Sequence, residues 1–291
     1  MENIDVKNIE SQIPDDGHLI QRILSNKKAV FGGIIVLLLF LMAIFAPIIA
    51  PHDYITMNLP NMLKAPGGEH IFGTDEFGRD IFSRIVYGAR ISLQVGFIAV
   101  GISLVIGTVL GAIAGYYGGI VDYIISSITD IAWALPVSLL AIALVAALGP
   151  SLNNLILAVS LVSWSGFARL VRGQFLTLRE KEFVEAAKAL GYSDSRIIFR
   201  HILPNAVAPI IVLTTLEVPK AIIIEASLSF LGMGAQPPTP SWGSIMNSGK
   251  DFILEAPWIS IFPGLMIMII VLGFNLFGDA LRDILDPRLK N

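Results

Sequence analysis

Two long apolar stretches without a charged residue constrain this chain more than any other feature. Residues 29–50 form a run of 22 uncharged residues, and residues 91–121 form a run of 31. A helix needs about 20 predominantly apolar residues to cross the hydrocarbon core of a bilayer. Only 15% of the residues are charged, against about 25% in a typical soluble domain. The sequence therefore predicts an all-α polytopic protein embedded in the lipid bilayer.

The first apolar run is expected to be a retained membrane anchor. Residues 1–28 before it are polar and predict a cytoplasmic N-terminal tail. The apolar part of a cleaved signal peptide has about 7–15 residues and ends in an A-x-A-like pattern of small residues. Residues 29–50 are longer and lack that ending, so we expect them to form the first transmembrane helix.

Five further apolar segments give six predicted transmembrane helices in total. Pro136 lies inside the third helix and is expected to kink it. An even number of crossings places both termini on the same side of the membrane. The five later helices are expected at about residues 91–116, 123–148, 152–168, 206–233 and 258–278.

The distribution of Lys and Arg predicts the orientation. Fourteen of these residues lie in the N-terminal tail, in residues 169–205 and after the last span, whereas five lie in residues 51–90 and at Lys250. Positive residues accumulate on the cytoplasmic side. Both termini and the segment 169–205 are therefore predicted to be cytoplasmic, in agreement with the number of spans, and the loop 51–90 is predicted to be external.

The second span carries small residues every four positions, at Gly107, Gly111 and Gly115. Such a stripe lets the backbone of another helix approach closely. Packing against a neighbouring helix is the main interpretation. A role in helix rotation during transport is the alternative.

The segment between the fourth and fifth spans predicts two short helices. Gly191 suits the left-handed residue that ends the first helix. Ser193 suits the N-cap of a second helix through Arg200, and Pro204 is expected to close it. Without further information this segment could be an ordinary amphipathic loop. Four residues of the first helix follow the i, i+3, i+4, i+7 spacing of one helical face: Phe183, Ala186, Ala187 and Leu190.

The identity of these residues favours a specific function. Glu185-Ala186-Ala187, followed by Gly191 and Leu203-Pro204, resembles the EAA signature of ABC importer permeases. In that family the loop is a coupling helix that inserts into a groove of the nucleotide-binding subunit. The resemblance implies an ATPase-coupling role for Glu182, Phe183, Glu185, Ala186, Ala187, Leu190, Gly191, His201, Leu203 and Pro204.

One residue departs from the common pattern and narrows the family. His201 occupies a position where a hydrophobic residue is common, and residues 200–205 are similar to the peptide-importer branch. Three other stretches resemble the C-type permease of dipeptide and oligopeptide importers, and the resemblance covers nearly the whole chain after residue 15. These stretches are residues 72–80, residues 225–232 with 240–243, and residues 278–283 with 286–288.

The resemblance implies a domain organisation and a fold. Residues 15–68 would form an N-terminal permease region that contains the first helix. Residues 88–282 would form an ABC transmembrane type-1 domain, with residues 169–205 as its cytoplasmic EAA coupling loop. The expected fold is the type I ABC importer transmembrane fold, with both termini cytoplasmic, in a bacterial or archaeal cytoplasmic (inner) membrane.

The resemblance also implies a mechanism and partners. The chain would be the permease subunit of an ATP-driven, binding-protein-dependent importer that moves dipeptides or oligopeptides by alternating access. The sequence has no Walker A motif, since its one Gly-Lys pair, Gly249-Lys250, is followed by Asp. ATP and Mg would therefore be bound by partner subunits, with no cofactor in this chain. The expected partners are a second homologous permease, two ATP-binding subunits and an external solute-binding protein, and nucleic acid is not among them. Nickel, glutathione or oligosaccharide importers share the architecture and remain alternatives.

The external loop carries paired charges and an apolar stripe. Ile81, Phe82, Ile85 and Val86 predict an interfacial helix at the membrane surface. Asp–Arg pairing is expected to hold the loop in shape and is compatible with docking of the binding protein. A calcium site is the alternative, but the acidic spacing does not follow the usual ligand order, so no metal is expected. The candidate residues here are Asp75, Gly78, Arg79, Asp80 and Arg84.

Charged residues within the spans are candidates for functional residues, because a charge at membrane depth is energetically costly. Glu217, Lys220 and Glu225 lie in the fifth span, and the first two can pair across one helical turn. They are expected to face the translocation pathway or the partner permease. A structural ion pair between helices is the alternative.

Two other classes of protein fit the sequence poorly. Ser163-Trp164-Ser165-Gly166 suggests the buried nucleophile of an intramembrane hydrolase, but the histidines that could serve as a base lie outside the spans. No catalytic residue is therefore predicted. A channel or secondary transporter would leave the EAA-like loop without a role, and no inverted repeat is visible. The four histidines are His18, His52, His70 and His201.

Overall fold

The computed structural model describes residues 16–285, and its long elements are all helices. Five helices are long and apolar enough to cross a membrane, and six crossings result if the bent pair α6 and α7 counts as one. The prediction of an all-α polytopic membrane protein is confirmed. The long helices are α3 (Lys27–Ile44), α5 (Ile81–Tyr117), α8 (Leu152–Leu178), α11 (Leu203–Phe230) and α13 (Trp258–Leu285). The bent pair is α6 (Gly119–Ala134) and α7 (Val137–Leu148).

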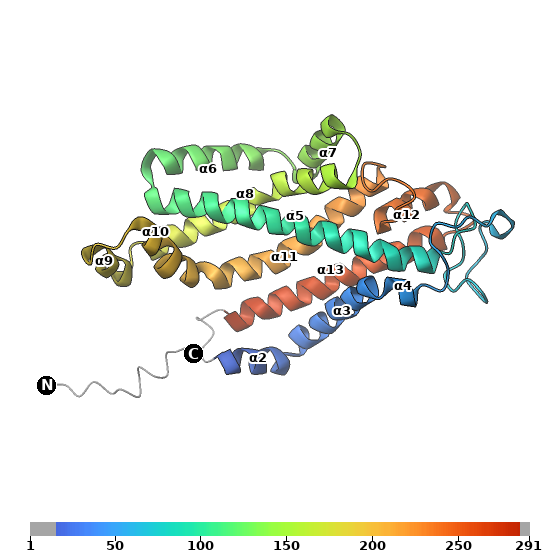
Figure 1. Cartoon of the computed structure of the whole chain (residues 1–291), viewed down its shortest axis with the longest axis horizontal. Coiled ribbons are helices and arrows are strands. Elements are labelled where there is room, and N and C mark those ends of the chain that lie inside the picture. Colours follow the sequence, from blue (N-terminus) through green and yellow to red (C-terminus); the bar gives the residue numbers. More distant parts are fainter. Residues whose placement is uncertain (1–15, 286–291) are drawn as a thin grey trace.

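The short elements gather at the two ends of the long helices (Figure 1). At one end lie α2, the C-terminal end of α13 and the hairpin of α9 and α10. At the other end lie α12 and the loop between α4 and α5. The described parts of both terminal helices thus lie at the same end as the hairpin, as parity and charge predict. The short elements are α2 (Asp16–Ser25), α4 (Ala46–Ile49), η1 (Leu59–Asn61), α9 (Glu182–Ala189), α10 (Asp194–Ile197), η2 (Ile198–Ile202), α12 (Trp242–Gly249) and η3 (Lys250–Phe252).

The first predicted span is a helix with a break near its external end. Asn26 caps α3 by accepting hydrogen bonds from the backbone N–H groups of Lys28 and Ala29. The helix is interrupted at Phe45, before α4. The guanidinium of Arg90 donates to the carbonyl oxygens of Ala43 at 2.7 Å and Ile44 at 3.3 Å, which satisfies acceptors that a helix end leaves free.

The second span is longer than predicted, and the separate interfacial helix does not exist. Asp80 caps α5 by accepting a hydrogen bond from the N–H of Ser83, and the helix continues for 37 residues to Tyr117. The apolar stripe contributes the first turns of α5. Ile81, Ile85 and Val86 are buried inside the subunit, because α12 and α13 pack around this end of the helix. The stripe marks a protein core and not a membrane surface.

The glycine stripe of α5 packs against α8, as predicted. A Cβ atom at Gly111 would lie 2.5 Å from the carbonyl oxygen of Ala168, and one at Gly115 would lie 2.6 Å from the Cβ of Phe175. Only glycine allows two helix backbones to approach this closely. The stripe therefore places α8, and the hairpin that follows it, directly against α5.

The third predicted span breaks at Pro136 instead of bending gently. The two helices α6 and α7 make an angle of 91°. Pro136 has no N–H and keeps the residue before it out of the helical region, and Leu135 has an extended backbone. The expected kink is thus a complete interruption of the helix.

The fourth helix continues past the predicted span: α8 runs to Leu178, so the first part of the predicted cytoplasmic segment 169–205 is helical. Arg169 and Arg172 end the apolar run of the sequence but not the helix. Arg169 lies 2.7 Å from Asp130, and Arg172 forms a two-pronged ion pair with Asp122. The carboxylates of α6 therefore pair with these charges along α8, at the surface of the subunit for Arg169 and partly buried for Arg172.

The start of the fifth span also differs from the prediction. Pro204 does not close the second short helix; it lies in the first turn of α11. Proline is well tolerated there, since the N–H it lacks has no partner within the helix. The chain runs from α10 through the π-helical turn η2 into α11, so the second half of the hairpin and the fifth span form one helical unit. The last helix is also longer than predicted and extends to Leu285, the last residue that the structure describes.

Candidate functional site

The hairpin of α9 and α10 has one face in the core and one face in solvent. Val184 and Ala187 are buried, with 0% and 3% of their surface exposed. They lie in an apolar cluster with Ile197, Ile198 and Ile202 of the second half of the hairpin, a cluster that also contains Val171 and Phe175 of α8. Phe183 and Leu190 are 41% and 71% exposed, and Ala186 between them is also exposed. The predicted four-residue face therefore divides into two. Ala187 anchors the helix, while the other three residues form an outward apolar surface, which we call the α9 docking face.

The first helix ends in the way that its sequence predicts. Gly191 has φ +75°, a backbone conformation that strongly favours glycine. Its N–H donates to the carbonyl oxygen of Lys188 at 2.9 Å, and the N–H of Tyr192 donates to that of Ala187 at 3.2 Å. These two bonds make a Schellman motif. The turn fixes the direction in which α10 leaves α9.

Aromatic side chains hold the second half of the hairpin. The rings of Tyr192 and His201 stack with centroids 5.8 Å apart, and the guanidinium of Arg196 lies 4.0 Å from the centroid of Tyr192. The hydroxyl of Tyr116, at the end of α5, donates to the carboxylate of Asp194 at 2.7 Å. His201 thus contacts the hairpin itself. It stabilises the position of α10 relative to η2.

The remaining predicted coupling residues lie on the same part of the surface. Glu182 and Glu185 are exposed and lie in the first turn of α9, where carboxylates interact favourably with the helix dipole. Leu203 is half-buried and Pro204 is exposed. Sequence reasoning missed the buried position of Val184 and the hydrogen bond from Tyr116 to Asp194. Val184 lies 100° from Phe183 around the helix, so a second apolar position was visible, whereas the Tyr116 contact joins residues 78 positions apart.

The external loop is held by buried ion pairs, as expected. The Oδ1 atom of Asp75 accepts hydrogen bonds from the backbone N–H groups of Phe77 and Arg79, both at 2.9 Å. Its Oδ2 atom lies 2.6 Å from the Nε of Arg79 and 3.5 Å from that of Arg84. Gly78 has φ +72° and packs directly onto the backbone of Asn58. The Asp–Arg pairs therefore stabilise a tight turn immediately before α5.

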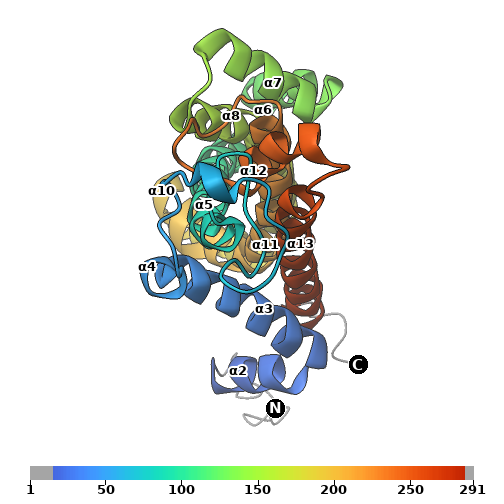
Figure 2. The same cartoon turned by 90° about the vertical axis from the view of Figure 1, so that its right-hand side faces the viewer.

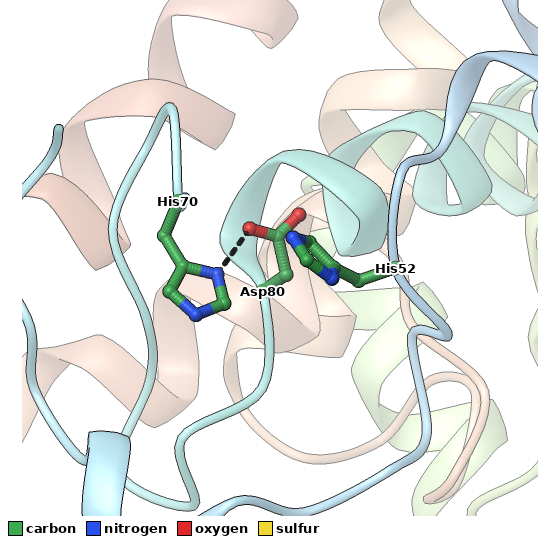
Figure 3. Close-up of side chains that lie close together, drawn as sticks. All are labelled: His52, His70 and Asp80. Atoms are coloured by element: carbon green, nitrogen blue, oxygen red, sulfur yellow. Dashed lines mark hydrogen bonds and ion pairs between the residues drawn. The ribbon is translucent and has the colours of Figure 1, made fainter. Parts of the chain in front are cut away.

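A second cluster in the same loop contains His52, His70 and Asp80 (Figure 3). The Nδ1 atom of His70 lies 2.9 Å from Oδ1 of Asp80. The other carboxylate oxygen of Asp80 accepts from the N–H and the hydroxyl of Ser83, both at 2.7 Å. The Nε2 atom of His52 lies 3.0 Å from the carbonyl oxygen of Glu69. These bonds join the loop to the N-terminus of α5.

The chemistry of this cluster fits hydrogen bonding better than metal binding. A cation held by Nδ1 of His70 would require a proton on Nε2 of the same ring. That Nε2 atom is buried and has no hydrogen-bond partner among residues 16–285, and metal-bound histidines ordinarily donate through their second nitrogen. A buried donor without a partner costs about 1–3 kcal/mol. The absence of a metal remains a prediction.

The carboxylate of Glu76, beside Asp75 and Arg79, is only partly solvated, with 14% of the side chain exposed. Its Oε1 atom lies 3.4 Å from Nη2 of Arg79. Burial raises the pKa of Glu76 above its ordinary value, and the nearby charge of Asp75 adds to the effect. The ionised form of Glu76 is therefore disfavoured in the folded loop.

The two mid-span charges of α11 form the pair that their spacing predicts. The ammonium of Lys220 lies 2.8 Å from the carboxylate of Glu217. The side chain of Lys220 is 63% exposed and that of Glu217 is 15% exposed. An exposed ammonium in a transmembrane helix needs protein or water around it. In the assembled protein this face must therefore meet one of the two.

Glu225 differs from the other two charges of the span, because it lies wholly inside the subunit. It is 0% exposed. Its carboxylate oxygens accept hydrogen bonds from the hydroxyls of Ser92 at 2.9 Å and Ser229 at 2.7 Å. Glu225 thus connects α11 to α5 and does not face a pathway or a partner surface in this conformation.

Ser165, from the weakly hydrolase-like stretch, serves helix packing. Its hydroxyl accepts a hydrogen bond from the indole N–H of Trp133 at 3.0 Å and donates to the carbonyl oxygen of Val162 at 3.3 Å. These contacts hold α6 against α8.

Family models cover most of the chain. Residues 107–291 match the family described as "Binding-protein-dependent transport system inner membrane component". Residues 18–66 match "N-terminal TM domain of oligopeptide transport permease C". The match over residues 18–66 extends into the external loop, and the match over residues 107–291 begins within α5.

Similar proteins match over nearly their whole length. The dipeptide transport system permease protein DppC of Alkalihalophilus pseudofirmus is 55% identical over 91% of this chain and 88% of its own. The oligopeptide transport system permease protein OppC of Bacillus subtilis is 46% identical over 92% of this chain and 88% of its own. The glutathione transport system permease protein GsiD of Escherichia coli O6:K15:H31 is 48% identical over 90% and 87%.

A solved structure shares the fold. A chain of the MetNI methionine ABC transporter, in an inward facing conformation, superposes with a TM-score of 0.58 at 19% identity. The match covers 70% of this chain and 97% of that chain. The arrangement of helices is thus that of an ABC transporter membrane subunit.

Proposed function

Because this chain belongs to the family of binding-protein-dependent transport system inner membrane components, we propose that it is the membrane subunit that carries dipeptides or oligopeptides through an ATP-driven importer. Members of this family are multi-pass permeases, and ATP hydrolysis resides in separate subunits. The similarity to a dipeptide permease and an oligopeptide permease supports the peptide substrate. Glutathione is the second candidate, because relatives with 48% identity carry that name.

The α9 docking face is the observation on which the coupling mechanism depends. Phe183, Ala186 and Leu190 expose apolar surface at the end of the molecule where α9 and α10 lie (Figure 1). Exposed apolar residues of this kind mark a protein interface. In the proposed mechanism this face binds a groove of an ATPase subunit. Val184 and Ala187 belong to the apolar cluster that joins α9 to η2 and the start of α11 and that also contains Val171 and Phe175 of α8. Movement of the ATPase is therefore transmitted through this cluster to the long helices.

The proposed topology has six crossings with both termini in the cytoplasm. In this arrangement α6 and α7 together make the third crossing of a type I ABC importer fold. Residues 15–68 form the N-terminal region, residues 88–282 the type-1 domain, and the segment up to residue 205 the coupling loop. The family matches over residues 18–66 and 107–291 support this division.

The proposed assembly contains a second homologous permease, two ATP-binding subunits and an external solute-binding protein. The binding protein would dock on the external loop, which the pairs of Asp75 with Arg79 and Arg84 keep rigid. The exposed ammonium of Lys220 would face the pathway between the two permeases. Peptides carry a terminal carboxylate that a lysine can attract, which supports this placement. ATP and Mg would be held by the ATPase subunits.

Co-purification of the complex tests the proposal. Phe183→Ala removes the largest side chain of the docking face, and we expect ATPase subunits to bind at least tenfold more weakly, since loss of an aromatic anchor costs about 2 kcal/mol or more. Leu24→Ala is the matched control, because Leu24 is 67% exposed on α2 at the same end of the molecule. Equal retention of ATPase by both variants would contradict the docking role.

Uptake by the reconstituted complex distinguishes the substrates. We expect ATP-dependent accumulation of a labelled dipeptide in proteoliposomes that also contain the binding protein. Accumulation of glutathione in preference to dipeptides would favour the second candidate. A complex that purifies without any ATPase would contradict the importer itself.

A further inference from the structure

The break between α6 and α7 lies near the middle of the membrane. The indole N–H of Trp133 bonds to the hydroxyl of Ser165 at 3.0 Å. Ser165 lies halfway along α8, which runs for 27 residues from Leu152 to Leu178. At about 1.5 Å per residue, Ser165 is roughly 20 Å from either end of that helix. The break at Leu135 and Pro136 follows Trp133 directly and is therefore deep in the hydrocarbon region, which is about 30 Å thick.

Backbone polar groups are exposed at this depth. The last carbonyl groups of α6 and the first N–H groups of α7 have no partners within their own helices, and no side chain caps α7. Every residue from 133 to 139 is exposed on the surface of the subunit. Non-helical backbone at membrane depth is tolerated only where protein or water covers it. Lipid therefore cannot cover this segment.

Charged side chains lie next to the break. The guanidinium of Arg169 lies 2.7 Å from the carboxylate of Asp130, and the two side chains are 46% and 69% exposed. The same guanidinium lies 4.0 Å from the centroid of the Trp133 ring. An ion pair this exposed is as unsuited to lipid as the broken backbone. We call the area formed by Asp130, Trp133, Leu135, Pro136 and Arg169 the break surface.

We propose that the break surface is the contact site for a transmembrane helix of the second permease subunit. The inference rests on the proposed function, since it requires a partner permease. Large apolar side chains dominate the area around the break, with Leu135 52% and Leu139 59% exposed, so a dry protein contact fits better than a water-filled channel wall. The partner helix must offer hydroxyl or amide groups to the free carbonyls of α6, and small residues that allow close approach.

The position of the break surface in the bundle agrees with this assignment. Figure 2 shows α6 and α7 on one side of the central helices and α3 on the opposite side. After Lys27 and Lys28 in its first turn, the outward side chains of α3 are apolar, including Leu38, which is 59% exposed. That side of the subunit is suited to lipid. The two sides of the bundle therefore differ in the chemistry of what they can contact.

Site-directed spin labelling in the assembled complex tests the assignment. The chain has no cysteine, so Leu135→Cys and Leu139→Cys each provide a single labelling site once the cysteines of the partner subunits are replaced. Leu38→Cys is the control, with the same 59% exposure as Leu139. Collision of the label with oxygen reports lipid, and collision with a water-soluble nickel chelate reports water.

We expect labels at both test positions to be immobile and to collide at least fivefold less with oxygen than the label at Leu38. Collision with the nickel chelate should be low as well, and oxygen collision should rise severalfold in the subunit reconstituted alone. Oxygen collision equal to that at Leu38 in the complex would overturn the proposal in favour of lipid, and strong nickel collision would overturn it in favour of a water-filled pathway. A complex that transports peptide but gives either result contradicts only this inference, whereas a complex without a second permease contradicts the proposed function as well.

Discussion

The hydroxyl of Tyr116 donates a hydrogen bond of 2.7 Å to the carboxylate of Asp194. Tyr116 is at the C-terminal end of α5, and Asp194 is the first residue of α10. The bond therefore connects the longest transmembrane helix to the hairpin that we propose to bind the ATPase. Two routes join the hairpin to the membrane region: the apolar cluster that contains Val184 and Ala187 together with residues of α8, η2 and α11, and this hydrogen bond to α5.

Tyr116→Phe removes this hydrogen bond and keeps the ring. We expect the complex to assemble, with peptide transported per ATP hydrolysed falling roughly fivefold, because a hydrogen bond of this kind contributes about 1 kcal/mol. The measurement is uptake and ATPase activity in the same proteoliposomes. Tyr117→Phe is the control, since Tyr117 is 55% exposed and lies next in sequence. An equal effect of the two substitutions would contradict this role of the hydrogen bond.

Gly191→Ala is expected to weaken the hairpin through its backbone. No atom would contact the added Cβ within 4 Å, so the cost arises from the positive φ alone and should be about 1–2 kcal/mol. Gly191→Asn should cost less, because asparagine tolerates this conformation better. The readout is limited proteolysis of the hairpin and retention of ATPase. Gly173→Ala, in open space on α8, should leave both unchanged.

Gly111→Ala is expected to separate α5 from α8. The new Cβ would lie 2.5 Å from the carbonyl oxygen of Ala168, and overpacking against backbone costs about 1–3 kcal/mol. Thermal unfolding in detergent should show a lower midpoint. Gly101→Ala on the same helix meets nothing within 4 Å and should be neutral or slightly stabilising. A normal midpoint for Gly111→Ala would mean that the two helices can move apart without cost.

The pair of Glu217 and Lys220 is expected to show strong coupling between its members. Lys220→Met leaves the carboxylate of Glu217, only 15% exposed, without its cation, and should reduce assembly. Combination with Glu217→Gln should restore assembly, because loss of both charges is less costly than loss of one. Transport should remain low in the double variant if Lys220 faces the pathway. Normal transport by the assembled double variant would favour a purely structural pair.

Glu76→Gln tests the buried carboxylate of the external loop. Burial raises the pKa of Glu76 in the folded protein above its pKa in the unfolded chain. The folded protein is therefore most stable, with respect to this group, at a pH below the unfolded pKa, and it loses stability as the pH rises through the folded pKa. We expect the substitution to raise the unfolding midpoint at pH 7 and to have no effect near pH 4, where the wild-type carboxyl is largely protonated. Glu69→Gln, at an exposed position of the same loop, is the control. A lower midpoint for Glu76→Gln at pH 7 would contradict the assignment.

Much of the candidate site follows from local sequence signals. The turn at Gly191 was predictable because a positive φ favours glycine whatever the tertiary context. The pairing of Glu217 with Lys220 follows from helical spacing. The split of the α9 face was not predictable, since Phe183, Ala186, Ala187 and Leu190 all fit one apolar stripe. Which of them is buried depends on where α8, α10 and η2 lie relative to α9. The spacing of apolar residues within α9 does not contain that information.

Two corrections have the same physical origin. Arg169 and Arg172 look like the end of a membrane span until Asp130 and Asp122 are placed beside them. Ile81, Ile85 and Val86 look like an interfacial stripe until α12 and α13 cover them. A charge or an apolar side chain indicates a membrane boundary when it faces lipid or water, but it indicates the protein interior when a partner side chain covers it. The partner side chains here are distant in the sequence, so the two cases cannot be distinguished locally.

The sequence by itself determined that this is a multi-pass membrane protein, that its helices pack through glycine, and that residues 182–200 form two short helical segments separated at Gly191. Hydrophobic length, small-residue spacing and backbone conformation are properties of a few neighbouring residues, so they can be recognised locally. The tertiary structure alone decided that Pro136 interrupts its helix completely, that Glu225 is enclosed within the subunit, and that Tyr116 meets Asp194. Those outcomes depend on which surfaces remain uncovered after the long helices pack together, and packing is a property of the whole chain.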